Sequence, residues 1–214
     1  MQQLLHLHIF VGTLMKQLLH FIIRGYLLDW LLFIPQIPSS PSTLRVLVWR
    51  RLRSAGALAL QSGIWILPST PKQEQFARDL LIEVQTQGAS GKIFRVTTLD
   101  EATERDILRE FQEQRDEEYA EFLEQCDALL AEMDKETRAR KFTFAELEEN
   151  EHGLGKLETW LKKIQDRDFV AGQGAQQALE RLEACRKMLQ NFSDQVYAQQ
   201  AMKPDEDEGD KEKE

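Results

Sequence analysis

Four arginines lie within a nine-residue stretch of the sequence, at Arg45, Arg50, Arg51 and Arg53, with Trp49 among them. Guanidinium groups bind phosphates and other oxyanions, often through two parallel hydrogen bonds. A basic helix with an aromatic side chain nearby is also common in surfaces that bind nucleic acids. The stretch therefore indicates a surface for nucleic acid or a protein partner, although no helix-turn-helix with a separate recognition helix is readable. The alternative is a solvated helix face whose arginines pair with acidic residues of the same chain.

A second polar group lies further along the chain, in the segments RDEEY and QDRDF. Arg115 occupies a position where the spacing of its neighbours favours an apolar side chain. A guanidinium there must pair with a carboxylate, reach solvent past its stem, or face a cleft and bind an oxyanion. Arg167 and Asp168 follow an expected helix, where they would fix a tight turn. We expect a polar cluster, either structural or oxyanion-binding, formed by Arg115, Tyr119, Arg167 and Asp168.

Motifs for catalysis are missing from the sequence. It contains no nucleophile elbow, no metal-binding motif and no glycine-rich nucleotide loop. His152 lies in an acidic segment without other ligands at suitable spacing, and the other three histidines precede residue 30. A metal-dependent phosphodiesterase would need a carboxylate at the end of the first strand, where the sequence has Pro35, Gln36 and Ile37. We therefore expect no enzymatic activity, no bound metal and no cofactor.

Charge is divided unevenly along the 214 residues, whose formal net charge is −9. Residues 1–95 contain ten lysines and arginines against four acidic residues, whereas residues 96–214 contain seventeen against thirty-two. A basic first part and an acidic second part favour contact with phosphate or head-to-back contact between copies. The overall acidity argues against a protein that coats nucleic acid without specificity.

Cys126 and Cys185 are the two cysteines of the chain, and both lie in segments with helical apolar spacing. They form neither a disulfide framework nor a C-x-x-C pair, so a reducing cytoplasm is the expected location. We expect both thiols to be buried as small apolar groups.

The first 28 residues are apolar but are interrupted by three histidines, a lysine and an arginine. A membrane-spanning helix needs about 20 predominantly apolar residues and rarely tolerates this many polar ones. The small-residue cleavage site of a secretory signal is also missing. Three interpretations stay open: a membrane or interfacial helix, a docked amphipathic helix, or an extension upstream of a natural start near Met15. We expect no membrane partner.

Residues 29–99 are expected to form a ferredoxin-like α/β sandwich. The apolar run WLLFIPQIP predicts a buried strand, and a Ser/Pro-rich loop then supplies an N-cap for the arginine helix, which ends at Gly56. The segment ALALQSGIWILP predicts one bent strand or two short strands around Gly63. A capping box at Thr70 predicts a second helix, and KIFRVTTL predicts the last strand. A core of about 70 residues is small, so this domain should lean on a neighbour.

Residues 100–200 have apolar residues at helical spacings of three and four. They predict one helix from Asp100 to about Met133, a second that begins at the capping box Thr143-x-x-Glu146, and a third around Cys185. Three such helices predict an antiparallel bundle, or a helical hairpin with a return helix. Residues 201–214 are charged and nearly free of apolar side chains, so a disordered acidic tail is expected there.

Three separated segments of the sequence resemble the family of ChrB N-terminal domains, which come from a bacterial protein associated with chromate resistance. The segments are DWLLFIPQIPSSPSTLRVLVWRRLRSAGALALQSGIWILPS, RDEEYAEF and WLKKIQDRDF, and they follow the family's order between about residues 29 and 196. The first part is also similar to the central domain of the PaaX transcription regulators and, more distantly, to the Cas2 fold. The missing carboxylate after the first strand argues against the nuclease activity of the latter.

The ChrB resemblance implies a chromate-responsive transcriptional regulator of an efflux-transporter operon, which would bind DNA. Family members continue into a C-terminal domain, whereas this sequence ends in an acidic segment. A separate protein of the ChrB C-terminal type is therefore an expected partner. The alternative function is a non-enzymatic protein–protein scaffold, in which the helices form a homodimer and the arginines pair only with acidic residues.

Overall fold

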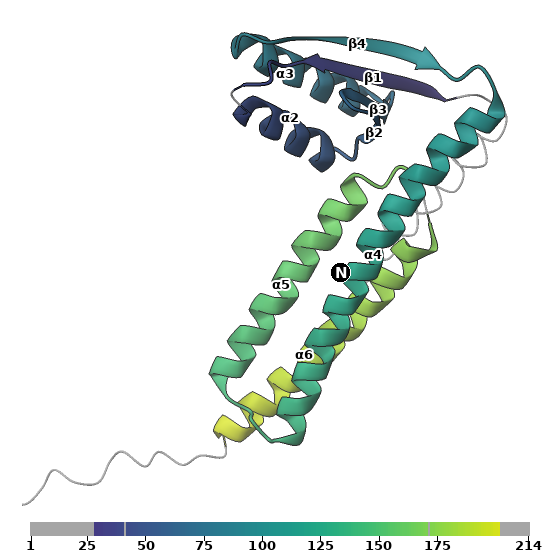
Figure 1. Ribbon diagram of the computed structural model, residues 1–214. Coiled ribbons are helices and arrows are strands. Elements are labelled where there is room, and N and C mark those ends of the chain that lie inside the picture. Colours follow the sequence, from purple (N-terminus) through teal and green to yellow (C-terminus); the bar gives the residue numbers. More distant parts are fainter. Residues whose placement is uncertain (1–27, 41, 171, 202–214) are drawn as a thin grey trace, which may run out of the picture. The chain divides into compact units, whose positions relative to one another are not determined.

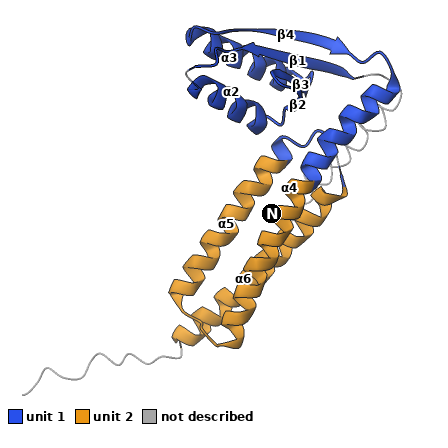
Figure 2. Cartoon of the chain, viewed as in Figure 1, with its two compact units in different colours: residues 1–116, 165–172 blue, residues 117–164, 173–214 orange. Residues whose placement is uncertain are grey.

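The computed structural model describes residues 28–40, 42–170 and 172–201. These residues form two compact units, which are coloured separately in Figure 2. Unit 1 contains the described residues up to Asp116 together with Gln165–Gly172, and unit 2 contains Glu117–Ile164 and the described residues from Gln173 onward. The expected N-terminal extension, apart from Leu28, and the acidic segment after Ala201 lie outside the described residues. Within the described part of the chain, no helix is long and apolar enough to cross a membrane.

Unit 1 is built on a four-stranded antiparallel sheet with the strand order β2-β3-β1-β4. Helix α2 connects β1 to β2, and helix α3 connects β3 to β4, which gives the βαββαβ order of a ferredoxin-like sandwich (Figure 1). The predicted α+β fold class is therefore confirmed. The elements are β1 (Asp29–Gln36), α2 (Thr43–Ser54), β2 (Leu58–Gln61), β3 (Ile64–Pro68), α3 (Pro71–Thr86) and β4 (Ser90–Thr97).

One face of the sheet packs against α2 and α3. Successive side chains of a strand point to opposite faces, so β1 contributes Leu31 and Phe33 to this core, opposite Leu67 and Trp65 of β3. All four side chains are buried. The two helices cover them with the buried side chains of Val48, Leu52, Ala77, Leu80 and Val84.

The opposite face of the sheet is covered by the first part of helix α4 (Glu101–Arg138). Trp30 of β1 stacks on Phe111 of α4, with ring centroids 5.6 Å apart and planes 7° from parallel. Phe111 also meets Phe169 edge-on, and Ile107 and Val170 complete this cluster. The small sandwich therefore leans on a neighbour, as predicted, and the neighbour is the beginning of α4 with the segment around Val170.

The turns of unit 1 explain where its strands and helices begin. Gly63 has a φ of 78° between β2 and β3, so the segment ALALQSGIWILP forms two short strands. The side chain of Thr70 caps α3 by accepting a hydrogen bond from the backbone N–H of Gln73 at 3.3 Å. At α2 the predicted cap was wrong in one respect, because Ser42 holds the N-cap position without a side-chain cap hydrogen bond.

Unit 2 consists of three helices, namely the remainder of α4 together with α5 (Phe144–Asp166) and α6 (Gln173–Ala201). Successive helices run antiparallel, as Figure 1 shows. Their shared core contains Cys126 and Cys185, which are free thiols and fully buried, as expected. Phe122 of α4 meets Trp160 of α5 edge-on, with ring centroids 5.6 Å apart.

The division between the units falls inside α4, after Asp116, and the segment Gln165–Gly172 belongs to unit 1. The sequence pattern placed the end of the α/β domain near residue 99, where the alternating strand pattern gives way to helical spacing. A change in the spacing of apolar residues along the sequence marks where a helix or strand begins. It does not reveal which core the element packs against, and Ile107 and Phe111 of α4 pack on the sheet.

Candidate functional site

Helix α2 positions the four arginines that stand out in the sequence. It buries Val48 and Leu52 against the sheet, and its 3.6-residue period places the four arginines on the outer side. All four are exposed. The helix ends at Gly56, whose φ of 78° lets Gly56 and Ala57 donate backbone hydrogen bonds to the carbonyls of Arg53 and Leu52 at 3.0 and 2.9 Å.

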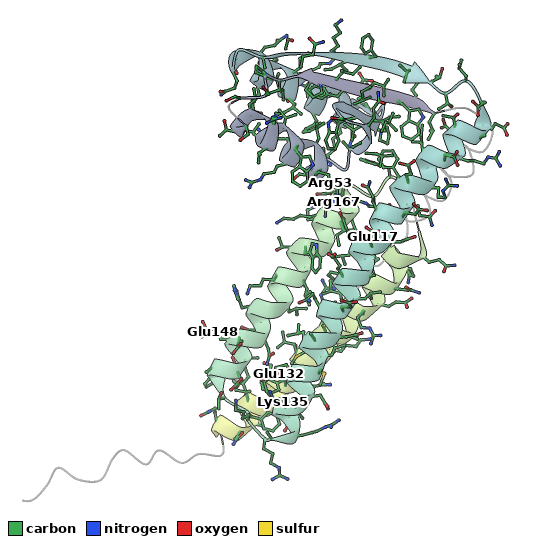
Figure 3. All side chains as sticks on the ribbon, in the orientation of Figure 1. Arg53, Glu117, Glu132, Lys135, Glu148 and Arg167 are labelled. Carbon is green, nitrogen blue, oxygen red and sulfur yellow. The ribbon has the colours of Figure 1, made fainter. Side chains whose placement is uncertain are left out.

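Gly56 is also a point of close approach within unit 1. A Cβ atom added at this position would lie 2.7 Å from the Cβ of Arg167 and 2.9 Å from its carbonyl oxygen. Both distances are shorter than van der Waals contact. The end of α2 is therefore fixed against the segment Gln165–Gly172, and the labelled Arg53 and Arg167 mark the two segments in Figure 3.

Arg51 is the arginine of this group that pairs with a carboxylate in the described part of the chain. Its Nη2 lies 3.1 Å from Oε2 of Glu83 in α3, and the two side chains are 58% and 30% exposed. An ion pair this exposed contributes little to stability, typically 0 to about 1 kcal/mol. The guanidinium of Arg51 can therefore exchange Glu83 for another anion at small cost.

The other three arginines make no ion pair within the described residues. Arg45 donates to the carbonyl oxygen of Ser39 at 2.7 Å, and Arg53 donates to the side-chain oxygen of Gln114 at 3.3 Å. Arg50 is exposed and has no polar partner there. Among the described residues, most of the positive charge of α2 is thus not neutralised by carboxylates.

Apolar side chains accompany the arginines on the outer side of α2. Trp49 is 53% exposed and Val46 is 44% exposed. An open depression of about 470 Å³ lies beside them and is lined by Ser42, Thr43, Val46, Leu47, Arg50 and Arg51. Guanidinium groups next to exposed aromatic and aliphatic side chains are typical of surfaces that bind nucleic acids or proteins.

The second predicted cluster is divided between the two units. Arg115, Arg167 and Asp168 belong to unit 1, and Tyr119 belongs to unit 2. Arg115, Tyr119 and Asp168 are buried, and each of the four side chains takes part in at least one polar, ionic or ring interaction. Asp168 accepts a hydrogen bond from the backbone N–H of Val170 at 3.2 Å, as a turn-forming aspartate does. Oxyanion binding by this cluster stays a prediction.

The sequence analysis missed a buried carboxylate in unit 1. Glu104 accepts hydrogen bonds from the backbone N–H of Leu28 and the indole N–H of Trp30, both at 3.0 Å, and from the hydroxyl of Thr98 at 2.6 Å. These bonds join the start of α4 to the sheet. Glu104 lies three residues before the buried Ile107, and residues at this spacing share one face of a helix. This spacing was a signal that Glu104 lies on the inward face of α4. An acidic residue in the first turn of a helix usually faces solvent, however, and this concealed its role.

Another buried carboxyl lies near the turn between α4 and α5. Burial raises the pKa of Glu136, and a hydrogen bond with Glu146 raises it further, whereas the amide of Asn150, which donates at 2.6 Å, lowers it. Lys141 lies 2.6 Å from Glu146 and holds the pKa of that carboxyl below its ordinary value. The network fixes the helical turn, so its role is structural.

Comparison with known protein families shows which family this chain belongs to. Residues 45–203 match the family described as Protein ChrB, N-terminal. The chain belongs to the ChrB N-terminal family. The match begins at Arg45 within α2, so it includes the four arginines of α2, most of unit 1 and the three helices of unit 2. The resemblance seen in the sequence is therefore confirmed.

A named ChrB relative covers part of the same region. Protein ChrB of Cupriavidus metallidurans is 30% identical to this chain over 94 residues, which is 44% of this chain and 28% of the relative. The aligned part therefore spans little more than a quarter of that protein's length.

Proposed function

We propose that this ChrB-family protein acts in bacterial chromate resistance as a cytoplasmic, non-enzymatic regulator of transcription. The arginine surface of α2, formed by Arg45, Arg50, Arg51 and Arg53, would be its DNA-contacting surface.

The observation that carries the proposal is the state of the guanidinium groups on α2. Arg51 alone pairs with a carboxylate in the described part of the chain, and that pair is exposed. Arg45 and Arg53 each bind one neutral oxygen. A guanidinium has five N–H donors, so each of these side chains keeps donors for phosphate oxygens.

The distribution of charge also supports a defined docking surface. Residues 1–95 have six more basic than acidic residues, although the chain as a whole is acidic. A polyanion would be attracted to the basic part and repelled by the rest. Such a protein would bind DNA on one surface and would not coat it.

Replacing Arg50 and Arg51 together by glutamine tests the proposal. The R50Q/R51Q variant removes two positive charges from α2 and keeps long polar side chains with good helix propensity. Fluorescence anisotropy with a labelled DNA duplex of about 30 base pairs, at fixed low salt, should give a Kd at least about tenfold higher than that of the native chain.

The matched control is R78Q/R109Q, which removes two other arginines from unit 1. Arg78 and Arg109 are 66% and 62% exposed and lie on α3 and α4. This control should change the Kd by less than about threefold. An equal loss in both variants would indicate a general charge effect. An unchanged Kd in R50Q/R51Q would favour the scaffold function without DNA contact.

A further inference from the structure

The outer side of helix α5 carries a regular stripe that the fold of unit 2 does not use. The inner side of α5 buries apolar residues such as Leu154, Leu157 and Leu161. On the opposite side, exposed residues recur at intervals of three and four, which places them on one face. This α5 stripe consists of Glu148, His152, Gly155, Thr159 and Lys163, with Lys156 beside it.

Gly155 at the middle of the stripe has no explanation within the described residues. A Cβ atom added there would meet nothing within 4 Å, whereas one added at Gly153 would lie 3.1 Å from Leu129 of α4. A glycine inside a helix costs about 1 kcal/mol relative to alanine. The feature that glycine offers on an outer face is room for another backbone to approach.

The surface around Gly155 has a shape that would let another helix approach closely. It forms an open depression of about 530 Å³, so a helix could lie over it more closely than over a continuous row of long side chains. The depression is lined by Glu151, His152, Gly155, Lys156, Thr159, Trp160 and Lys163.

The ends of the stripe carry opposite charges at similar distances from Gly155. Glu148 precedes the glycine by seven residues and Lys163 follows it by eight, about 10 to 12 Å along the helix axis on either side. Figure 3 shows the labelled Glu148 on the outer side of α5, away from α4 and α6. In the part of the chain that the structure describes, neither charged end has an ion-pair partner.

Two arginines of α6 show how exposed cations of unit 2 pair across its helices. Arg181 lies 3.2 Å from Asp127, and Arg186 lies 2.7 Å from Glu158. Both pairs join α6 to a neighbouring helix of the same unit. Glu148 and Lys163 of the α5 stripe form no such pair within the described residues.

We propose that two copies of this chain associate through antiparallel contact between their α5 stripes, with the helices crossing at Gly155. In this arrangement Glu148 of one copy lies at the height of Lys163 of the second copy, and the two-fold axis repeats the pair. The same patch serves both copies, as a closed two-fold dimer requires. The contact does not depend on the arginine surface of α2.

A second copy fits this surface better than a nucleic acid does. Residues 96–214 carry seventeen basic residues against thirty-two acidic ones, so a polyanion is repelled by most of the surroundings and by Glu148 within the stripe. An antiparallel copy instead places each end charge opposite its complement. One helix-on-helix contact is small, so the dimer should be weak and reversible.

Charge reversal in the full chain tests the pairing. Sedimentation velocity between about 5 and 200 µM should show a reversible monomer–dimer equilibrium. Each single variant, Glu148→Lys or Lys163→Glu, places like charges opposite one another at both symmetry-related positions of the dimer. Each should therefore raise the Kd of the dimer at least about tenfold. The double variant E148K/K163E restores opposite charges and should return the Kd to within about threefold of the native value.

Two further variants test the crossing point. Gly155→Leu fills the depression and should raise the Kd by at least about tenfold, whereas Glu124→Lys, an exposed reversal on α4, should leave it unchanged. Circular dichroism and the Tm confirm that each variant is folded. A chain that stays monomeric at the highest concentration, a folded G155L that still dimerises, or a double reversal no better than the single ones would overturn the proposal.

Discussion

A side chain at Gly56 would meet two obstacles: the φ of this residue is 78°, and a Cβ atom added there would lie 2.7 Å from the Cβ of Arg167. Gly63 has the same φ, but an added Cβ there would meet nothing within 4 Å. Gly63→Ala should therefore cost about 1 kcal/mol for the backbone alone, and Gly56→Ala about 3 kcal/mol because the steric clash is added. Urea denaturation measures both. Equal losses would mean that the segment around Arg167 moves aside freely.

Glu136 makes the stability of unit 2 depend on pH. Because burial raises the pKa of Glu136 above its unfolded value, its favourable contribution is present below the unfolded pKa and is lost as the pH rises through the folded pKa. Glu136→Gln keeps an acceptor for Asn150 and removes the buried charge. We expect its Tm to match that of the native chain near about pH 4 and to exceed it increasingly towards about pH 8.

The matched control for this pH dependence is Glu132→Gln. Glu132 is 53% exposed and pairs with Lys135 at 2.9 Å, near the same end of α4 (Figure 3). This variant should show a much smaller gain in Tm at the higher pH, because the charge that it removes is solvated and is the smallest of the causes that raise the pKa of Glu136. A Glu136→Gln variant that became less stable than the native chain with rising pH would contradict the assigned direction.

At the scale of the elements, Glu104 governs the attachment of α4 to the sheet. Glu104→Ala leaves the donors of Leu28, Trp30 and Thr98 without their acceptor, and an unsatisfied buried donor costs about 1 to 3 kcal/mol. We expect a loss of about 3 kcal/mol in the free energy of unfolding. Glu101→Ala, at an exposed position in the same helical turn, is the control. Equal effects of the two variants would show that the network is dispensable.

Most elements could be predicted because the signals that define them are local. The period of apolar residues, Gly63 and the capping pair of Thr70 and Gln73 lie within the segments that they shape. The exposed arginines of α2 could be predicted for the same reason. Their partners could not be predicted, since Glu83 is 32 residues from Arg51 and Gln114 is 61 residues from Arg53.

At the scale of the whole molecule, the chain leaves unit 1 within α4 and returns to it for the short segment Gln165–Gly172. Local patterns identify that segment as a turn between helices. They do not show that Phe169 packs on Phe111, or that Arg167 lies against Gly56. The organisation of unit 1 is therefore set by contacts distant in sequence, and these also fix the end of the arginine helix.

The salt dependence of DNA binding tests most sharply whether the arginines of α2 meet phosphate. Each phosphate contact contributes about −0.9 to the slope of log K against log salt concentration. We predict a steep negative slope for the native chain, and a slope shallower by about 2 for R50Q/R51Q, with R78Q/R109Q unchanged. A native chain that does not bind DNA, or a slope that R50Q/R51Q leaves unaltered, would contradict the proposed DNA surface.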